Sequence, residues 1–137
     1  MNVDMTVLPK GTILYHGTSA DDFDEACEDL RGPAWFSRQK SVAERFARRF
    51  AGASCRIVVF ELTEDVSLYE ILHQRDMQEL ADEFDISLCG VEAMRESVEY
   101  SGIPGWVIPY NYSDGDDILI VNTDVVSYLR TEQLEKS

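Results

Sequence analysis

Basic residues are scarce in this chain. Its 137 residues include 12 lysines and arginines against 26 aspartates and glutamates, and the formal net charge is −14 at pH 7. A surface of this charge repels phosphate backbones and anionic membranes. Binding to nucleic acid or to a membrane is therefore not expected. A cleft can still carry local positive potential, and an acidic surface can imitate DNA for a protein partner.

Cysteine and histidine are also few. Cys27, Cys55 and Cys89 are odd in number, widely separated and form no CxxC pair, and there are two histidines. We expect no zinc site or other metal site from such a set. The chain shows no signal segment and no apolar run of transmembrane length. The sequence therefore predicts a protein of a reducing cytoplasm, either in the producing cell or in a host.

Internal repeats and low-complexity linkers are absent as well, and the length fits a single domain over residues 1–137. Strand-like segments flank a helical middle instead of alternating with helices, which predicts the α+β class. The predicted strands cover residues 13–16, 34–37, 55–62, 66–71, 106–108, 118–121 and 125–129, after an edge segment at 7–9.

The clearest predicted helix begins with a capping box, formed by Ser41 and Glu44, and ends at Gly52. Two further helices are predicted where apolar residues repeat at helical spacing, over 77–84 and 91–98. Residues 21–30 form either a short helix or a loop. Pro109 is expected to halt the strand before it, and residues 111–115 to form a polar loop.

The stretch Leu14-Tyr15-His16-Gly17-Thr18-Ser19 turns from an apolar strand into polar atoms. Strand alternation places Leu14 and His16 on one face and Tyr15 on the other. Gly17 has no Cβ, so its backbone can be approached closely or can turn out of the sheet. Taken alone, the stretch also fits a strand end with a turn glycine.

Three pieces in order carry a family resemblance: Tyr15-His16-Gly17-Thr18, then Trp35-Phe36-Ser37 with Phe46 beyond it, then Asp114-Gly115-Asp116-Asp117 before an apolar strand. Together they resemble the ADP-ribosyltransferase superfamily, in its His-Tyr-Glu branch, which includes the poly-ADP-ribose polymerases and diphtheria toxin. The resemblance runs from about residue 14 to residue 129. It implies a split core of two small packed sheets with flanking helices, and NAD⁺ as co-substrate in the cleft between the sheets.

The first piece would hold the nicotinamide end of NAD⁺. In the family, the histidine at the position of His16 bonds the nicotinamide ribose. The backbone of the next glycine, here Gly17, bonds the nicotinamide amide. Thr18 completes this set of NAD⁺-binding residues.

The second piece would enclose the nicotinamide ring. Trp35 and Phe46 match the family's two stacking aromatics, where tyrosine is commoner, and stacking requires an aromatic face and no hydroxyl. Phe36 and the hydroxyl of Ser37 are expected beside them. The alternative is that these aromatic residues are simply core.

The third piece would supply the catalytic carboxylate. Asp117 stands where the family usually has a glutamate, which stabilises an oxocarbenium-like transition state as nicotinamide departs. Strand alternation turns Asp116 to the opposite face. An acidic turn without catalytic function is the alternative.

Seven of the twelve basic residues fall between Arg31 and Arg56. This basic island suits a pyrophosphate, although for Arg48 and Arg49 a solvated helix face paired with acids is the better explanation.

The resemblance implies transfer of ADP-ribose from NAD⁺ to a macromolecule. We expect a protein acceptor, modified by a toxin, an effector or a phage-borne enzyme, with Asp117 and His16 as catalytic residues. Two alternatives stay open: an inactive module of the same fold that acts through its acidic surface, and an RNA 2′-phosphotransferase.

Overall fold

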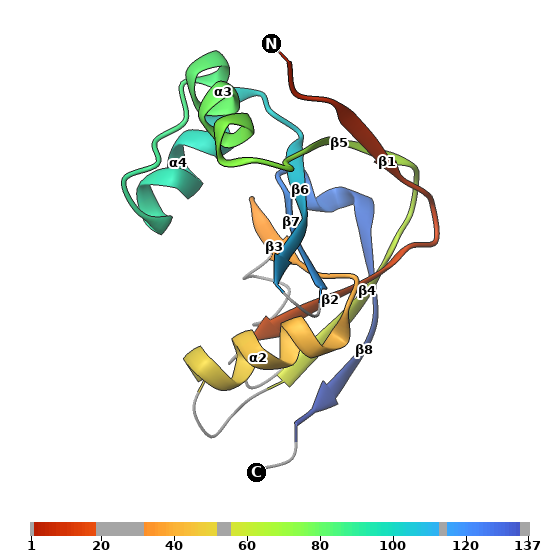
Figure 1. Ribbon diagram of the computed structural model, residues 1–137. Helices are drawn as coiled ribbons and strands as arrows, with labels where there is room; N and C mark the ends of the chain where they lie inside the picture. Colours follow the sequence, from red (N-terminus) through yellow and green to blue (C-terminus); the bar gives the residue numbers. More distant parts are fainter. Residues whose placement is uncertain (1, 19–31, 52–55, 113–114, 135–137) are drawn as a thin grey trace.

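Two β-sheets form the centre of the molecule. The computed structural model describes residues 2–18, 32–51, 56–112 and 115–134. One sheet has five strands in the order β1-β5-β6-β7-β3, and the other has three in the order β2-β4-β8 (Figure 1). Neighbouring strands are antiparallel except for the parallel pair β5 and β6. The strands are β1 Met5–Leu8, β2 Ile13–Thr18, β3 Ala34–Phe36, β4 Arg56–Leu62, β5 Val66–Glu70, β6 Gly105–Tyr112, β7 Gly115–Ile120 and β8 Val126–Gln133, and the helices are α2 Lys40–Ala51, α3 Gln74–Phe84, α4 Val91–Ser101 and the short η2 Thr123–Val125.

The helices cover the outer faces of the two sheets, at opposite ends of the molecule (Figure 1). Helices α3 and α4 pack on the five-stranded sheet, where Leu80 and Val98 join a buried cluster with Trp106. Helix α2 packs on the three-stranded sheet through Ala43 and Ala47. Between the sheets lies the main core, built by inward-facing residues of both, among them Leu14, Phe36, Val58, Phe60, Leu68, Val107 and Ile118. The predicted α+β class and split core are confirmed.

Gly17 lets helix α2 lie against strand β2. A Cβ at this position would stand 2.5 Å from the carbonyl oxygen of Ala43 and 2.9 Å from the amide nitrogen of Ala47. Both contacts are closer than real Cβ atoms tolerate, and both involve backbone that cannot swing aside. The close approach anticipated at Gly17 is therefore made by a helix, and the strand continues straight to Thr18.

The end of strand β3 joins the two sheets. Tyr15 of β2 and Ser37 exchange two backbone hydrogen bonds of 2.8 and 3.0 Å. The hydroxyl of Ser37 donates to Asp116 Oδ1 of β7 at 2.9 Å. The same carboxylate accepts from the amide of Arg38 at 2.9 Å and from its Nε at 2.6 Å. The amide of Asp116 donates to Gln39 Oε1 at 2.9 Å. One buried carboxylate thus fixes the connection from β3 to α2.

Three local predictions are wrong. The helix α2 begins at Lys40 and not after Ser41, so the capping box of Ser41 and Glu44 does not exist. Pro109 does not halt its strand, because β6 runs on to Tyr112 and its register with β7 shifts between Ile108 and Tyr112. Such an irregularity leaves room for a residue without an N–H donor. Residues 111 and 112 belong to β6 and Gly115 to β7, so the expected polar loop is largely a hairpin.

The other strands and helices lie where the sequence predicts them, within a few residues. The first two residues of the predicted edge segment at 7–9 belong to β1, which ends at Leu8 and pairs with β5 at the margin of the five-stranded sheet. The predictions for residues 21–30, Gly52, Cys55 and Asp114 fall outside the described residues. Of the helices in the described part of the chain, none has the length and apolarity that crossing a bilayer requires.

The carboxylate of Asp116 should stabilise the fold. Asp116→Asn keeps the shape of the side chain but removes the charge that binds Arg38, and the buried hydrogen bonds to a charged group are weakened. We expect the free energy of unfolding to fall by about 1.5–3 kcal/mol in urea denaturation. Asp124→Asn, at an exposed position of η2, is the matched control and should change it by less than about 0.5 kcal/mol. Equal stability of both variants would contradict this assignment.

Candidate functional site

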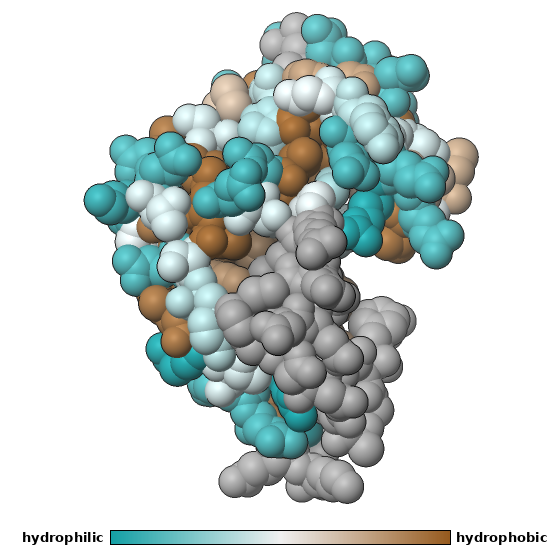
Figure 2. Space-filling model, turned by 180° about the vertical axis from the view of Figure 1, so that it is seen from behind, coloured by the Kyte–Doolittle hydropathy of each residue, from teal (hydrophilic) through white to brown (hydrophobic). Residues whose placement is uncertain are grey.

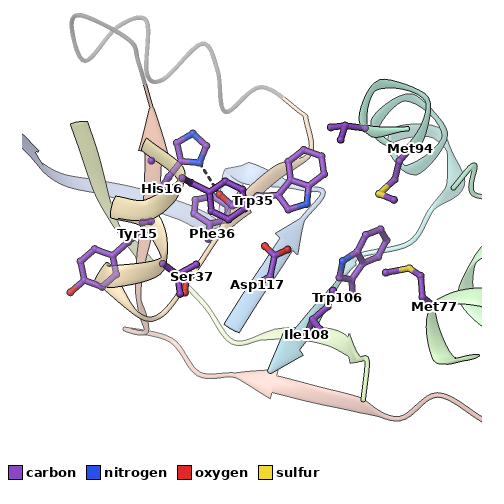
Figure 3. A pocket seen from close by; sticks show the side chains of 15 residues that line it. Tyr15, His16, Trp35, Phe36, Ser37, Met77, Met94, Trp106, Ile108 and Asp117 are labelled. Atoms are coloured by element: carbon purple, nitrogen blue, oxygen red, sulfur yellow. Dashed lines mark hydrogen bonds between the residues drawn. The ribbon is translucent and has the colours of Figure 1, made fainter. Parts of the chain in front are cut away.

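A cavity of about 680 Å³ opens beside the junction of the two sheets (Figure 3). Its volume lies within the range of small-molecule sites. Most of the exposed lining is apolar, with a few polar groups among aromatic rings. The lining residues are Tyr15, His16 and Gly17 of β2, Trp35, Phe36 and Ser37 at β3, Val42, Ala43 and Phe46 of α2, Met77 of α3, Val91 and Met94 of α4, Trp106 and Ile108 of β6, and Asp117 of β7.

The imidazole of His16 is held in one orientation. Its Nδ1 lies 2.7 Å from the carbonyl oxygen of Trp35, and since a carbonyl only accepts, Nδ1 carries the proton. In the neutral ring, Nε2 is then the acceptor. The ring also packs against Phe36, with centroids 5.7 Å apart. Leu14, on the same face of the strand, enters the core between the sheets, as the alternation predicts.

Asp117 has an unusual environment for a carboxylate. Burial, and to a smaller extent the charge of Asp116, raise the pKa of Asp117 from 3.8 to about 6. The side-chain amide of Asn111 lies 3.5 Å from its Oδ2. Asp116 is 2% exposed and bound to Ser37 and Arg38, whereas Asp117 lines the cavity. The two neighbours therefore face opposite sides of β7, as predicted, and only Asp117 is available to a bound molecule.

The predicted aromatic residues meet at this cavity. Trp35 and Phe46 are partly buried and line it from β3 and from α2. Phe36 lines it too, yet it is only 3% exposed and contacts Phe60 in the core between the sheets. Phe36 is thus chiefly a core residue, whereas Trp35 and Phe46 keep surface for a ligand.

The other predicted residues differ in what they offer a ligand. Ser37 lines the cavity, but its hydroxyl is bound to Asp116 and accepts the amide of Gln39 at 3.1 Å. Gly17 lines the cavity with backbone atoms only, since it has no side chain. Thr18 ends β2, and its side chain is outside the described part of the structure. Nowhere in the described residues do three His, Cys, Asp or Glu side chains gather as a metal ion would require.

Eight lining residues are not among the predicted site residues. Tyr15, Val42 and Ala43 adjoin the predicted ones on β2 and α2, whereas five others come from α3, α4 and β6: Met77, Val91, Met94, Trp106 and Ile108. Their helical and strand spacing marked them only as buried faces. Nothing local in the sequence shows that these faces border an open cavity, because this depends on how α3 and α4 are placed over the sheet. Val91 is 71% exposed, so it is no core residue.

The basic island is divided between several partners. Arg38 binds Asp116 at 2.6 Å, and Lys40 binds Glu132 of β8. Arg45 and Arg48 lie exposed on α2. Arg31 and the side chain of Arg49 are outside the described residues. The two basic residues nearest the junction are therefore paired with the chain's own acids.

The chain resembles a known protein in fold but none in sequence. No protein family and no curated protein matches the chain by sequence. Among solved structures, it is similar to a chain of the MbcT–MbcA toxin–antitoxin complex of M. tuberculosis, with a TM-score of 0.53 and 11% identity. The match covers 93% of this chain and 86% of that one. At this identity the match establishes that the two chains share a fold over nearly their whole length.

Proposed function

We propose that this protein transfers ADP-ribose from NAD⁺ to a protein acceptor. The observation that carries the proposal is one cavity lined by an oriented histidine, two partly buried aromatic rings and a single desolvated carboxylate, Asp117. These are the residue types that the sequence resemblance assigns to NAD⁺. They come from four separate elements, β2, β3, α2 and β7, so their meeting in space is independent of the sequence order that suggested them.

The chemistry follows from these groups. Trp35 and Phe46 offer faces to the nicotinamide ring, and His16 offers a fixed acceptor for a ribose hydroxyl. The bond between nicotinamide nitrogen and ribose C1′ breaks, and both its electrons leave with nicotinamide. The positive charge left on the ribose is stabilised by the carboxylate of Asp117 in a poorly solvated site. A nucleophile of the acceptor then bonds to C1′ and loses its proton.

Charge supports a protein as the acceptor. A net charge of −14 disfavours nucleic acids and favours basic proteins. The structural neighbour is part of a toxin–antitoxin complex, and a toxin that modifies a protein of its host cell is the setting we infer for this chain. The RNA 2′-phosphotransferase alternative is weaker, because Arg38 and Lys40 are already bound to carboxylates.

Asp117→Asn tests the reaction most simply. The amide keeps the shape but not the charge that stabilises the oxocarbenium-like state, so turnover should fall on the order of 10²–10³-fold. NAD⁺ binding should weaken much less than turnover, because that charge acts mainly in the transition state. The measurement is nicotinamide release and transfer of labelled ADP-ribose to proteins of a cell lysate, with NAD⁺ binding followed by calorimetry.

Asp124→Asn, at an exposed position of η2, is the control and should keep the turnover of the natural chain. NAD⁺ binding without any turnover in the natural chain would point to the inactive module. Equal turnover of the natural chain and Asp117→Asn would remove Asp117 from the mechanism.

The buried carboxylate should also cost stability. Because the pKa of Asp117 is raised to about 6, folding favours the protonated form of this side chain. The stabilisation that protonated Asp117 gives the folded state is lost as the pH rises from about 4 through 6. Asp117→Asn should match the natural chain near pH 4 and exceed its unfolding free energy above pH 6, by up to about 3 kcal/mol. Urea denaturation at both pH values, with Asp124→Asn for comparison, measures the difference. A difference independent of pH would contradict the burial of this charge.

A further inference from the structure

The cavity contains two regions of different chemistry. One, beside His16 and Phe46, is where the proposed function places nicotinamide and its ribose. The other is enclosed by α3, α4 and β6. We call it the apolar lobe, formed by Met77, Val91, Met94, Trp106 and Ile108. None of these side chains carries a charge, and the indole N–H of Trp106 is their only hydrogen-bond donor.

Asp117 lies at the border between the two regions. Its cross-strand partner is Ile108 of the apolar lobe, and such partners stand on the same face of a sheet about 5 Å apart. Figure 3 shows the carboxylate of Asp117 between the side chains of Phe36 and His16 on one side and those of Trp106 and Met77 on the other. A molecule held in the apolar lobe would therefore reach the same carboxylate as one held beside His16.

The apolar lobe does not suit the remaining parts of NAD⁺. A pyrophosphate and a second ribose are best held by charged or multiple hydrogen-bond donors, which this lobe lacks. Met77 and Met94 are partly buried around Trp106. Methionine adapts readily to apolar groups of varied shape. The lining fits an aromatic or long aliphatic side chain.

The surroundings of the apolar lobe are strongly acidic. Residues 74–101, which span α3 and α4, contain eight aspartates and glutamates but two arginines. Hydrophilic side chains predominate at the upper right of the view from behind, the side on which α3 and α4 lie (Figure 2). A partner segment with lysine or arginine beside its apolar residue would meet complementary charge here.

We propose that the apolar lobe binds an apolar side chain of the acceptor protein, in a segment where lysine or arginine flanks that side chain. The anchored segment would present its nucleophile to the ribose C1′ next to Asp117. This inference rests on the proposed function and specifies its acceptor.

Methionine methyl groups give a direct readout of this lobe. Of the chain's four methionines, Met77 and Met94 line it, and Met5 is 50% exposed on β1. In a chain with ¹³C-labelled methionine methyls, acetyl-Lys-Phe-Lys-amide should shift the Met77 and Met94 signals saturably and leave Met5 in place. Acetyl-Lys-Ala-Lys-amide and acetyl-Glu-Phe-Glu-amide should each bind at least about tenfold more weakly, because one lacks the apolar group and the other the charge.

A non-hydrolysable carbocyclic analogue of NAD⁺ separates the two proposals. With the analogue saturating, the Lys-Phe-Lys peptide should bind with equal or higher affinity, since the two occupy different regions. If the analogue displaces the peptide, the lobe belongs to the dinucleotide and our inference is overturned. If the analogue does not bind at all, the proposed function fails, and the peptide titration alone decides whether the lobe takes basic, apolar segments.

Val91→Lys provides a variant that leaves the core intact, since Val91 is 71% exposed. It places a positive charge at the apolar lobe and should weaken the Lys-Phe-Lys peptide about tenfold or more. Met5→Lys is the matched control on a remote exposed position and should change the affinity less than twofold. Equal peptide affinity in both variants and the natural chain would overturn the proposal.

Discussion

The site depends on the short segment from Trp35 to Gln39, which binds both sheets at once. The backbone of Ser37 pairs with Tyr15 of the three-stranded sheet, while Asp116 of the five-stranded sheet holds the Ser37 hydroxyl and Arg38. The carbonyl of Trp35 fixes the ring of His16. Without this junction, nothing would fix the distance between His16 on the three-stranded sheet and Asp117 on the five-stranded sheet. The binding geometry is therefore a consequence of how the sheets are joined.

Two adjacent aspartates of β7 have different roles because alternation along the strand points their side chains to opposite faces of the sheet. Asp116 is buried among donors that satisfy its charge, so it serves as a structural anchor. Asp117 faces the cavity and has few partners there, and burial raises its pKa to about 6. Its desolvation makes the fold less stable when the group is ionised, and in the proposed reaction the same desolvation strengthens its interaction with a developing positive charge.

The sequence predicts most of the fold because the strong patterns are local. The apolar run at β4 and the helical spacing of Met77, Leu80 and Phe84 each have one reasonable interpretation, and both are confirmed. Local patterns mislead at Pro109, where a register irregularity keeps the strand going. At Ser41, an apparent cap lies inside the helix, which begins at Lys40 directly after Gln39. Gln39 accepts a long-range hydrogen bond from the amide of Asp116 and donates its own amide to the hydroxyl of Ser37, and these bonds hold the start of α2 in place.

Most of the site residues predicted from the sequence motifs line one cavity in the structure. They include His16, Trp35, Phe46 and Asp117. The apolar lobe was not foreseen, because the stripes on α3 and α4 look the same whether they face a core or an opening. Phe36 shows the converse, since an aromatic residue of a predicted site proves to be largely core. The spacing of apolar residues identifies which face of a helix or strand is buried. Whether that face packs in the core or lines a cavity depends on how the elements are placed in the fold.

The most direct test of the account is the titration of the Asp117 carboxyl carbon by ¹³C NMR, assigned by its loss in Asp117→Asn. In the free chain this carboxyl should titrate with a pKa of about 6. With the carbocyclic NAD⁺ analogue bound, the pyridinium charge of nicotinamide should lower this pKa, because a nearby positive charge favours the ionised carboxyl. A pKa near 3.8 in the free chain, or one that stays unchanged while the analogue binds, would contradict the placement of Asp117 beside the bond to be broken.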